Sequence, residues 1–287
     1  GNIENLDDVK ENPNYTFVHG DICDKKLVPL LVEQVDAVVN FAAESHVDRS
    51  ITGPEIFIET NVKGTLNLLQ AAKQFKTQRY LQVSTDEVYG SLGKTGYFTE
   101  TTPLAPNSPY SASKASADML VRAYHETYKM PVLTTRCSNN YGPYQYPEKL
   151  IPFFISQLLK GEKVPVYGDG LNVRDWLYVY DHCAAIDTVL HKGRAGEVYN
   201  IGGHNEKTNM EITRIILDAM GKDESSIKYV DDRLGHDKRY AISNDKIQSE
   251  LGWQPSLTFE EGIKLTIDWY LNNQEWIKHI EEKKCSI

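Results

Sequence analysis

The sequence predicts an α/β fold in which helices cover both faces of a mostly parallel sheet. Strand-like and helical segments alternate along the first half of its 287 residues. Residues 37–41 form a mainly apolar segment, as expected of a strand that is buried on both faces. Residues 59–75 instead place their apolar side chains at helical spacing, at Val62, Leu66, Leu69 and Ala72.

The expected elements follow one another in a regular order. A strand at residues 15–19, a helix at 26–34 and the strand at 37–41 come first. They precede the helix at 59–75, a strand at 79–84, a long helix at 108–129 and a strand at 132–136. In the second half we expect a helix at 150–159, a turn at 161–165 leading into a short strand, a strand at 198–201, and helices at 209–220 and 259–271. Such alternation is typical of a Rossmann-like, doubly wound parallel sheet.

The pattern becomes less regular near Asn139, which suggests a smaller α/β domain added to the sheet domain. We assign residues 1–138 and 173–204 to the sheet domain, and residues 139–172 and 205–287 to the second domain. The strand, glycine-rich turn and helix that normally open a dinucleotide-binding fold are missing, because the sequence contains no G-x-G-x-x-G pattern. The chain also begins with Gly1 rather than Met, so we expect its start to be either cut or unresolved.

Composition narrows the classes of function. The formal net charge of -9 disfavours nucleic acid and anionic membranes as partners. No apolar run is long enough to cross a bilayer, and no signal peptide opens the chain. The four cysteines are scattered at Cys23, Cys137, Cys183 and Cys285. This spacing predicts reduced thiols in a cytoplasmic protein and no metal site.

Tyr110 and Lys114 are one helical turn apart and therefore share a helix face. An ammonium beside a phenol lowers the phenol's pKa and makes it a usable base for a hydroxyl proton. Thr85 ends a predicted parallel strand about 25 residues earlier, where such sheets bind their ligands. By itself the Tyr–Lys spacing also fits a solvated surface helix.

Six motifs together carry a specific resemblance. They occupy residues 41–48, 84–90, 109–114, 137–143, 148–152 and 174–179. In this order they resemble the extended short-chain dehydrogenase/reductases, and within them the nucleotide-sugar 4,6-dehydratases. The resemblance extends from about Asp21 to about Tyr270. It implies that the sheet domain binds NAD and that the second domain binds a nucleotide-diphosphate sugar, with dTDP-glucose as the expected substrate.

The implied reaction oxidises the sugar at C4, eliminates water across C5–C6 and returns the hydride to C6. The resemblance implies that Tyr110, with Lys114, takes the O4 proton and that Thr85 orients the reacting hydroxyl. Glu87 would remove the C5 proton as base, and Asp86 would protonate the leaving C6 hydroxyl as acid. Two adjacent carboxyls must then hold opposite protonation states, which requires different environments. Without the resemblance, a solvated Asp-Glu pair at a strand end is the plainer interpretation.

Further binding residues are implied by the same motifs. The cofactor positions are Asp21, Ile22, Phe41, Ala42, Ala43, Thr60, Tyr110, Lys114 and Asn140. The substrate positions are Ser45, Thr85, Asn139, Lys149, Leu150, Pro165, Tyr167, Arg174, Asn209, Arg233, His236 and Tyr270.

Several alternatives stay open at this point. Arg174 precedes Asp175, with which it could form a local ion pair, and His236 could be a plain loop histidine. Leu234 replaces the family's usual proline, which should loosen this loop. The other histidines are interpreted as structural or surface residues: His19, His46, His125, His182, His191, His204 and His279.

Two alternatives concern the whole protein. A 4-epimerase or decarboxylase of the same family would keep the Tyr–Lys pair without needing an acid and a base at positions 86 and 87. A truncated, non-catalytic sugar-nucleotide-binding remnant is the alternative that the missing glycine turn suggests. The family also forms homodimers through the helices at 59–75 and 108–129, whose apolar faces otherwise simply pack on the sheet.

Overall fold

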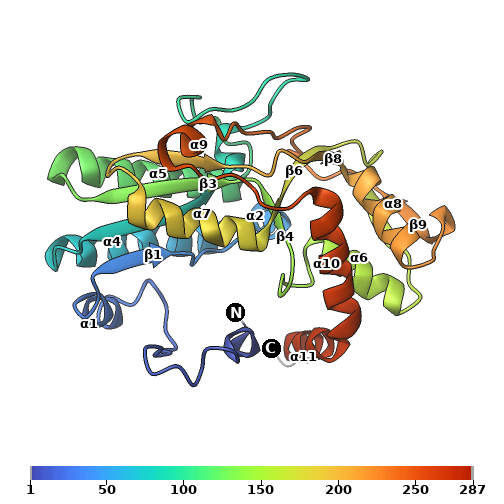
Figure 1. Cartoon of the computed structure of the whole chain (residues 1–287), viewed down its shortest axis with the longest axis horizontal. Coiled ribbons are helices and arrows are strands. Elements are labelled where there is room, and N and C mark those ends of the chain that lie inside the picture. The colour runs from blue at the N-terminus through green and yellow to red at the C-terminus, as the bar shows by residue number, and fades with distance from the viewer. Residues whose placement is uncertain (1, 286–287) are drawn as a thin grey trace.

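The computed structural model describes residues 2–285, and side chains as far as residue 282. A four-stranded parallel sheet with the order β1-β2-β3-β7 forms the centre of the larger lobe (Figure 1). Neighbouring strands pair in register, with Tyr80 opposite Val132 and Leu81 opposite Leu133. The predicted parallel sheet is therefore confirmed. The strands are β1 (Ala37–Asn40), β2 (Arg79–Thr85), β3 (Val132–Cys137) and β7 (Val198–Ile201).

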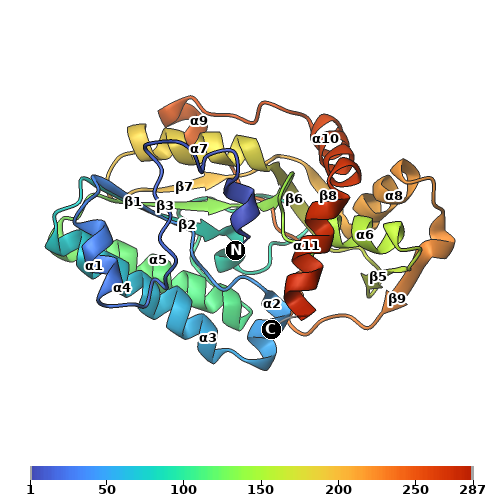
Figure 2. The same cartoon turned by 90° about the horizontal axis from the view of Figure 1, so that it is seen from below.

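Helices cover both faces of this sheet, as Figure 2 shows. Tyr80 and Val132 point into a core shared with the helices of one face, whereas Leu81 and Leu133 point into the core of the other. This alternation explains why the strands are apolar on both faces. The first face carries α1 (Leu27–Val32), α3 (Glu55–Phe57), the π-helical η2 (Ile58–Gly64), α4 (Thr65–Gln74) and α5 (Pro109–Tyr128), and the second carries α7 (Val179–Lys192) and α9 (Asp245–Leu251).

A smaller lobe packs beside the carboxyl ends of the strands. Its core joins Phe154, Ile216, Phe259 and Ile277 from four helices, together with residues of connecting segments. The helices are α6 (Leu150–Leu159), α8 (Asn209–Ala219), α10 (Phe259–Asn272) and α11 (Gln274–Cys285). Two small sheets complete it, one pairing β5 (Val164–Tyr167) with β9 (Ile227–Val230) and the other ordered β4 (Asn139–Tyr141), β6 (Val173–Tyr178) and β8 (Glu206–Thr208).

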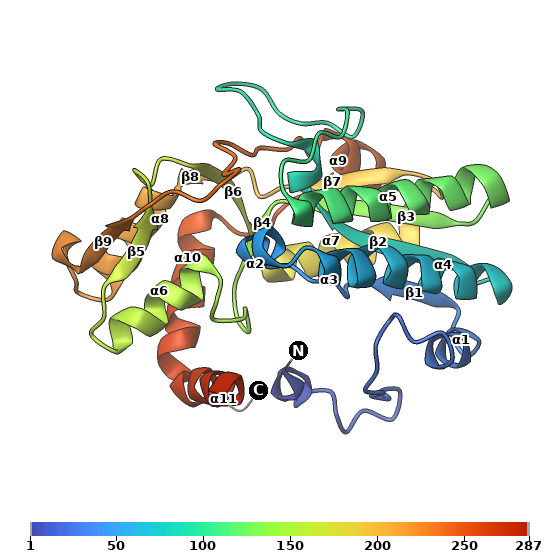
Figure 3. The same ribbon diagram turned by 180° about the vertical axis from the view of Figure 1, so that it is seen from behind.

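Short helices connect and brace the lobes. Helix α2 (Val47–Thr52) lies between them (Figure 3), and three 3-10 helices are η1 (Ile3–Leu6), η3 (Asp86–Tyr89) and η4 (Glu224–Ser226). At the N-terminus, Asn5 accepts a hydrogen bond from Trp276 of α11 at 2.9 Å. Conversely, Ile247 and Trp253, which come from the C-terminal part of the chain, pack into the core of the large sheet. The division into residues 1–138 with 173–204 and residues 139–172 with 205–287 stays a prediction. The N-terminal segment with Asn5 and the segment with Ile247 and Trp253 each pack against the lobe to which the prediction does not assign them.

The N-terminal strand prediction is wrong. Residues 15–19 are irregular, and Phe17 is 54% exposed. Within residues 2–285, β1 pairs with β2 along one edge and has no strand on the other. An extended segment without a partner strand cannot form ladder hydrogen bonds. The same open edge leaves Ala37, Val38 and Val39 half-buried rather than buried on both faces.

Candidate active site

The carboxyl end of β2 carries the predicted catalytic segment. Thr85 caps η3, and its hydroxyl accepts a hydrogen bond from the Glu87 amide at 3.2 Å. This tight turn directs the next two carboxyls differently. Asp86 is 1% exposed, and its Oδ2 has no hydrogen-bond partner. Glu87 is half-buried and borders a cavity between the lobes.

Helix α5 brings Tyr110 and Lys114 to the same place. It begins with a reciprocal capping box between Ser108 and Ser111, and Pro109 occupies its first turn. Tyr110 and Lys114 are both buried on the sheet-facing side. The Lys114 ammonium donates to the carbonyl oxygen of Val83 in β2 at 2.8 Å. This contact fixes the helix face against the strand that ends in Thr85.

The two neighbouring carboxyls differ electrostatically. Burial raises the pKa of Asp86 well above its ordinary range, and the charges of Glu87 and Asp175 add to this effect. Burial also raises the pKa of Glu87, but the cations Arg174, Arg233 and Lys149 act against it. Asp86 is therefore the better proton donor and Glu87 the better base.

The expected effect of Lys114 on Tyr110 is not found. Burial raises the pKa of Tyr110 well above its ordinary value, and the Glu87 charge raises it further, while a hydrogen bond with Thr85 lowers it. Burial lowers the pKa of Lys114. Desolvation of the buried phenol outweighs the nearby ammonium, which is directed at the Val83 carbonyl.

A cavity of about 520 Å³ opens beside Glu87, between the lobes. Ten of the twelve residues that the resemblance predicts to bind substrate line this cavity. Thr85 and Tyr270 are the two predicted substrate residues that do not line it. Its walls include Ser45, Asn139, Lys149, Leu150, Pro165, Tyr167, Arg174, Asn209, Arg233 and His236.

Arg174 is a buried cation of this cavity. Its guanidinium donates to the carbonyl oxygens of Val173 at 2.8 Å and Asp237 at 2.9 Å. Asp175 points elsewhere and accepts hydrogen bonds from the amides of Gly203 and Asn205. The alternative of a local Arg174–Asp175 ion pair is therefore wrong. In the described part of the chain no ion pair involves Arg174, so its charge is available to an anionic ligand.

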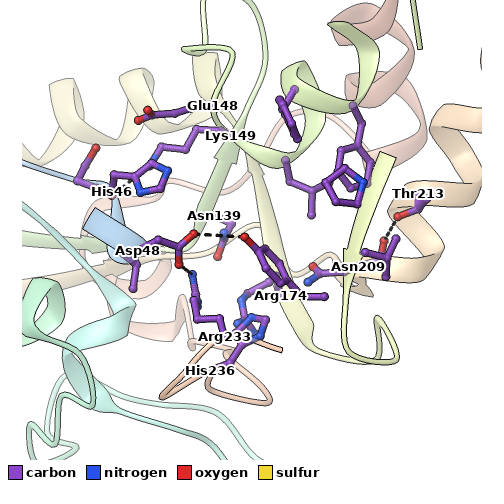
Figure 4. Close-up of a pocket in the computed structure, with 18 of the residues that line it drawn as sticks. His46, Asp48, Asn139, Glu148, Lys149, Arg174, Asn209, Thr213, Arg233 and His236 are labelled. Atoms are coloured by element: carbon purple, nitrogen blue, oxygen red, sulfur yellow. Dashed lines mark hydrogen bonds and ion pairs between the residues drawn. The ribbon is translucent and has the colours of Figure 1, made fainter. Parts of the chain in front are cut away.

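Asp48 and His46 are cavity residues that the predictions missed. Figure 4 shows Asp48 beside Arg233, with which it forms an ion pair. The ion pair has a length of 3.6 Å, and the Tyr167 hydroxyl donates to the other oxygen of Asp48 at 3.5 Å. His46, interpreted above as structural or surface, lines the cavity and also caps α2 by accepting from the Arg49 amide. Both belong to the motif at residues 41–48, which was the one signal that could have found them.

Tyr270 and His236, both predicted to bind substrate, lie in different surroundings. Tyr270 is completely buried, and its hydroxyl donates to the carbonyl oxygens of Gly142 and Gln145. It therefore belongs to the core of the smaller lobe and does not line the cavity. His236 does face the cavity, with Nδ1 at 2.6 Å from the Asp232 carboxylate. Burial lowers its pKa.

The predicted cofactor residues gather at the carboxyl edge of the parallel sheet, outside this cavity. Phe41 follows β1 directly and is exposed, and Ala42 is held by the Asn40 side chain. Asn140 follows β3, and its Oδ1 lies 2.8 Å from His182 Nδ1. This edge is where open parallel sheets bind dinucleotides. The remaining members are Asp21, Ile22, Ala43 and Thr60, of which Asp21 is exposed and the others half-buried.

Among the side chains of residues 2–282, no three His, Cys, Asp or Glu groups lie together in a way that could hold a metal ion. None of the helices within residues 2–285 combines the length and the apolar composition that a bilayer crossing requires.

Known proteins resemble the chain over nearly its whole length. A dTDP-glucose 4,6-dehydratase of Xanthomonas campestris is 58% identical over 98% of this chain and 86% of its own length. The low-salt glycan biosynthesis protein Agl12 of Haloferax volcanii is 55% identical over 96% of this chain and 88% of its own length.

Solved structures of nucleotide-sugar enzymes also resemble the chain. DesIV of Streptomyces venezuelae, a dTDP-glucose 4,6-dehydratase with NAD bound, superposes with a TM-score of 0.96 at 54% identity, covering 98% of this chain and 87% of its own. A UDP-glucose 4-epimerase of Thermus thermophilus superposes at 0.83 with 31% identity, covering 88% and 84%. The family model for GDP-mannose 4,6 dehydratase matches residues 1–266. The chain therefore belongs to the GDP-mannose 4,6 dehydratase family, within the extended short-chain dehydrogenase/reductases.

Proposed function

We propose that this protein is an NAD-dependent hydro-lyase that converts dTDP-glucose to dTDP-4-keto-6-deoxyglucose. The observation that carries the proposal is the pair of unlike carboxyls, Asp86 and Glu87, beside Tyr110 at the edge of a cation-lined cavity. Several relatives between 50% and 58% identical are named dTDP-glucose 4,6-dehydratase. The product would feed deoxysugar synthesis, such as that of dTDP-rhamnose.

The first step removes the hydroxyl proton at C4 of the sugar. Tyr110 accepts this proton, and the Thr85 hydroxyl orients the reacting oxygen. Lys114 lies one turn further along the same buried helix face, but its ammonium is directed at the Val83 carbonyl oxygen. The contact of Tyr110 that favours the ionised phenol is its hydrogen bond with Thr85.

The second step eliminates water. Once C4 is a ketone, the C5 proton is acidic, and Glu87 removes it while Asp86 protonates the departing C6 oxygen. The raised pKa of Asp86 favours the protonated form of this carboxyl, which is the form that a proton donor needs. Glu87 afterwards returns its proton to C5 and the hydride taken from C4 is returned to C6, so that the product differs from the substrate by one water. The proton that Tyr110 took from O4 is released, and Asp86 regains the one that it gave.

The described residues fit NAD at its nicotinamide and ribose end. Tyr110, Lys114 and Asn140 would hold that end, and Asp21 offers an exposed carboxylate at the sheet edge. When bound, NAD supplies the reversible hydride acceptor that C4 oxidation and C6 reduction require.

The diphosphate of the substrate would lie among Lys149, Arg174 and Arg233 (Figure 4). Guanidinium groups bind phosphate oxygens in pairs, and burial in a cavity strengthens the attraction. Asn139 and Ser45 line the same cavity as Glu87 and would contact the sugar.

An isotope experiment tests the reaction. Substrate deuterated at C4 should yield a product that has lost one water and carries the deuterium at C6. Simple epimerisation would instead return the deuterium to C4 with no loss of mass. Retention of the C6 hydroxyl in the product would rule out the proposed dehydratase.

We also propose a homodimer formed through η2, α4 and α5. Met119 of α5 and Ile58 of η2 are exposed apolar side chains on this side of the sheet. A cytoplasmic location is proposed because Cys23, Cys137 and Cys183 are free thiols. The mass of the purified protein in solution, measured by light scattering, tests the dimer.

A further inference from the structure

The loop between β9 and α9 supplies Arg233 and His236 to the cavity, and one buried side chain anchors it. Asp237 is 8% exposed, although it belongs to a loop with an exposed tip at Leu234. Its Oδ1 accepts a hydrogen bond from Asn107 Nδ2 at 2.7 Å, and its Oδ2 accepts one from the Tyr240 hydroxyl. A carboxylate satisfied by two donors in the interior is a strong local constraint.

The main chain of the same residue holds the buried cation of the cavity. The carbonyl oxygen of Asp237 accepts hydrogen bonds from Arg174 Nη2 at 2.9 Å and from Asn172 Nδ2 at 3.2 Å. The ring of Tyr240, which the Asp237 carboxylate fixes, lies 4.5 Å from the Arg174 guanidinium carbon. Arg174 is therefore held from two sides by groups that depend on Asp237.

Asn107 connects Asp237 to the helix that carries Tyr110 and Lys114. It directly precedes Ser108, the cap of α5, and α5 carries Tyr110 and Lys114. The carboxylate of Asp237 therefore ties the substrate loop to the start of the catalytic helix. Because Arg174 is held by the same residue, the distance between the guanidinium and the helix is set through Asp237.

We infer that Asp237 is a positioning residue, which acts through Arg174 to hold the diphosphate of the substrate. The inference rests on the proposed function. Asp237 itself does not line the cavity, so its effect on binding must pass through Arg174 and Tyr240. Asparagine at this position has one acceptor oxygen, so one of the two side-chain contacts must break or reverse.

The test compares Asp237→Asn with wild type in the NAD-loaded enzyme. We expect the KM for dTDP-glucose and the Kd for dTDP to rise about tenfold, with kcat changed less than threefold, because uniform binding is weakened rather than the chemical step. A double-mutant cycle with Arg174→Lys identifies the path. If Asp237 acts through Arg174, then Asp237→Asn should weaken dTDP binding less than threefold in the Arg174→Lys background.

Asp181→Asn is the matched control. Asp181 is also buried and also anchors a loop, by accepting hydrogen bonds from Ser256 and the Leu257 amide. It should lower the melting temperature without changing the KM. Fully additive losses in the double-mutant cycle, or an unchanged Kd for dTDP in Asp237→Asn, would overturn the inference.

The proposed function can fail separately. Wild-type enzyme that binds dTDP but releases no dehydrated product would overturn the reaction, and the Kd values would still decide the role of Asp237. Wild-type enzyme that does not bind dTDP would overturn both.

Discussion

Asp86 and Glu87 are adjacent in sequence, yet their carboxyls lie in opposite electrostatic surroundings. Asp86 is enclosed, and one of its oxygens has no partner. Glu87 borders the cavity, where three cations favour its ionised form. The 3-10 turn that starts at Thr85 produces this difference, because it directs successive side chains to different sides of the strand end. An acid and a base can thus act within one active site at a single pH.

Glu87→Gln should separate the two halves of the reaction. The variant keeps the shape of the side chain but cannot take the C5 proton, so C4 oxidation should persist while water loss falls by at least about a hundredfold. Rapid quenching followed by mass spectrometry should show a 4-keto sugar of unchanged oxygen count. Glu148→Gln is the control. Glu148 is a carboxyl that also lines the cavity and forms an ion pair with Arg49 at 2.8 Å, and its substitution should slow turnover less than tenfold. Normal yields of the 6-deoxy product from Glu87→Gln would refute the role of this residue.

Asp86→Asn should lower activity and raise stability. The pKa of Asp86 is raised in the folded state from its ordinary value of 3.8. The unfolded chain therefore releases this proton more readily, and folding stability falls as the pH rises from about 4 towards the raised value. The amide cannot ionise, so its advantage in melting temperature should grow over this range and vanish below pH 4. Melting curves at several pH values check the sign. Equal pH dependence in both proteins would contradict it.

The strongly patterned elements could be predicted from the sequence. The helix at residues 150–159 and the strand at 198–201 have the predicted bounds. Helix α5 begins and ends within one residue of its predicted limits. Ser108 and Pro109 are typical of a helix start, so the sequence marks where this helix begins. Arg174 and Arg233 are far apart in sequence and come together in the cavity only through the fold. Local patterns could not predict that they meet, so the prediction depended on the family motifs.

Other features depend on long-range contacts that no local pattern contains. Strand β6 runs directly into α7 at Tyr178 and Val179 without a Gly or Pro, and its buried Arg174 and Asp175 interrupt the apolar pattern. Tyr270 faces the core of the smaller lobe because helix α10 packs there, which its motif position does not show. The pKa of Tyr110 depends on burial, which spacing alone cannot give.

The buried pair of Asp118 and Arg136 should be important for stability. Arg136 Nε lies 2.9 Å from Asp118 Oδ2, with both side chains almost inaccessible to water. Asp118→Ala would leave a buried charge without its partner, so the free energy of unfolding should fall by about 3–5 kcal/mol. Urea denaturation measures this loss. The exposed pair of Lys10 and Asp7 is the control, and Asp7→Ala should change stability by less than about 1 kcal/mol. A loss of similar size in both variants would contradict the prediction.

Gly203 should tolerate no side chain, because the chain passes too close to β6. A Cβ at this position would lie 1.9 Å from the carbonyl oxygen of Trp176, which is backbone and cannot move aside alone. Gly203→Ala should therefore displace β6 and lower the free energy of unfolding by about 1–3 kcal/mol. Since Gly203 also donates its amide to Asp175, the neighbour of Arg174, nucleotide affinity should fall as well.

Gly93→Ala is the control for this substitution. Nothing lies within 4 Å of a Cβ built at Gly93, so its stability should stay within about 0.5 kcal/mol of wild type. Urea denaturation and dTDP titration of both variants give the comparison. A Gly203→Ala protein as stable as Gly93→Ala would show that β6 can shift freely. The position of Arg174 would then not depend on this close backbone contact.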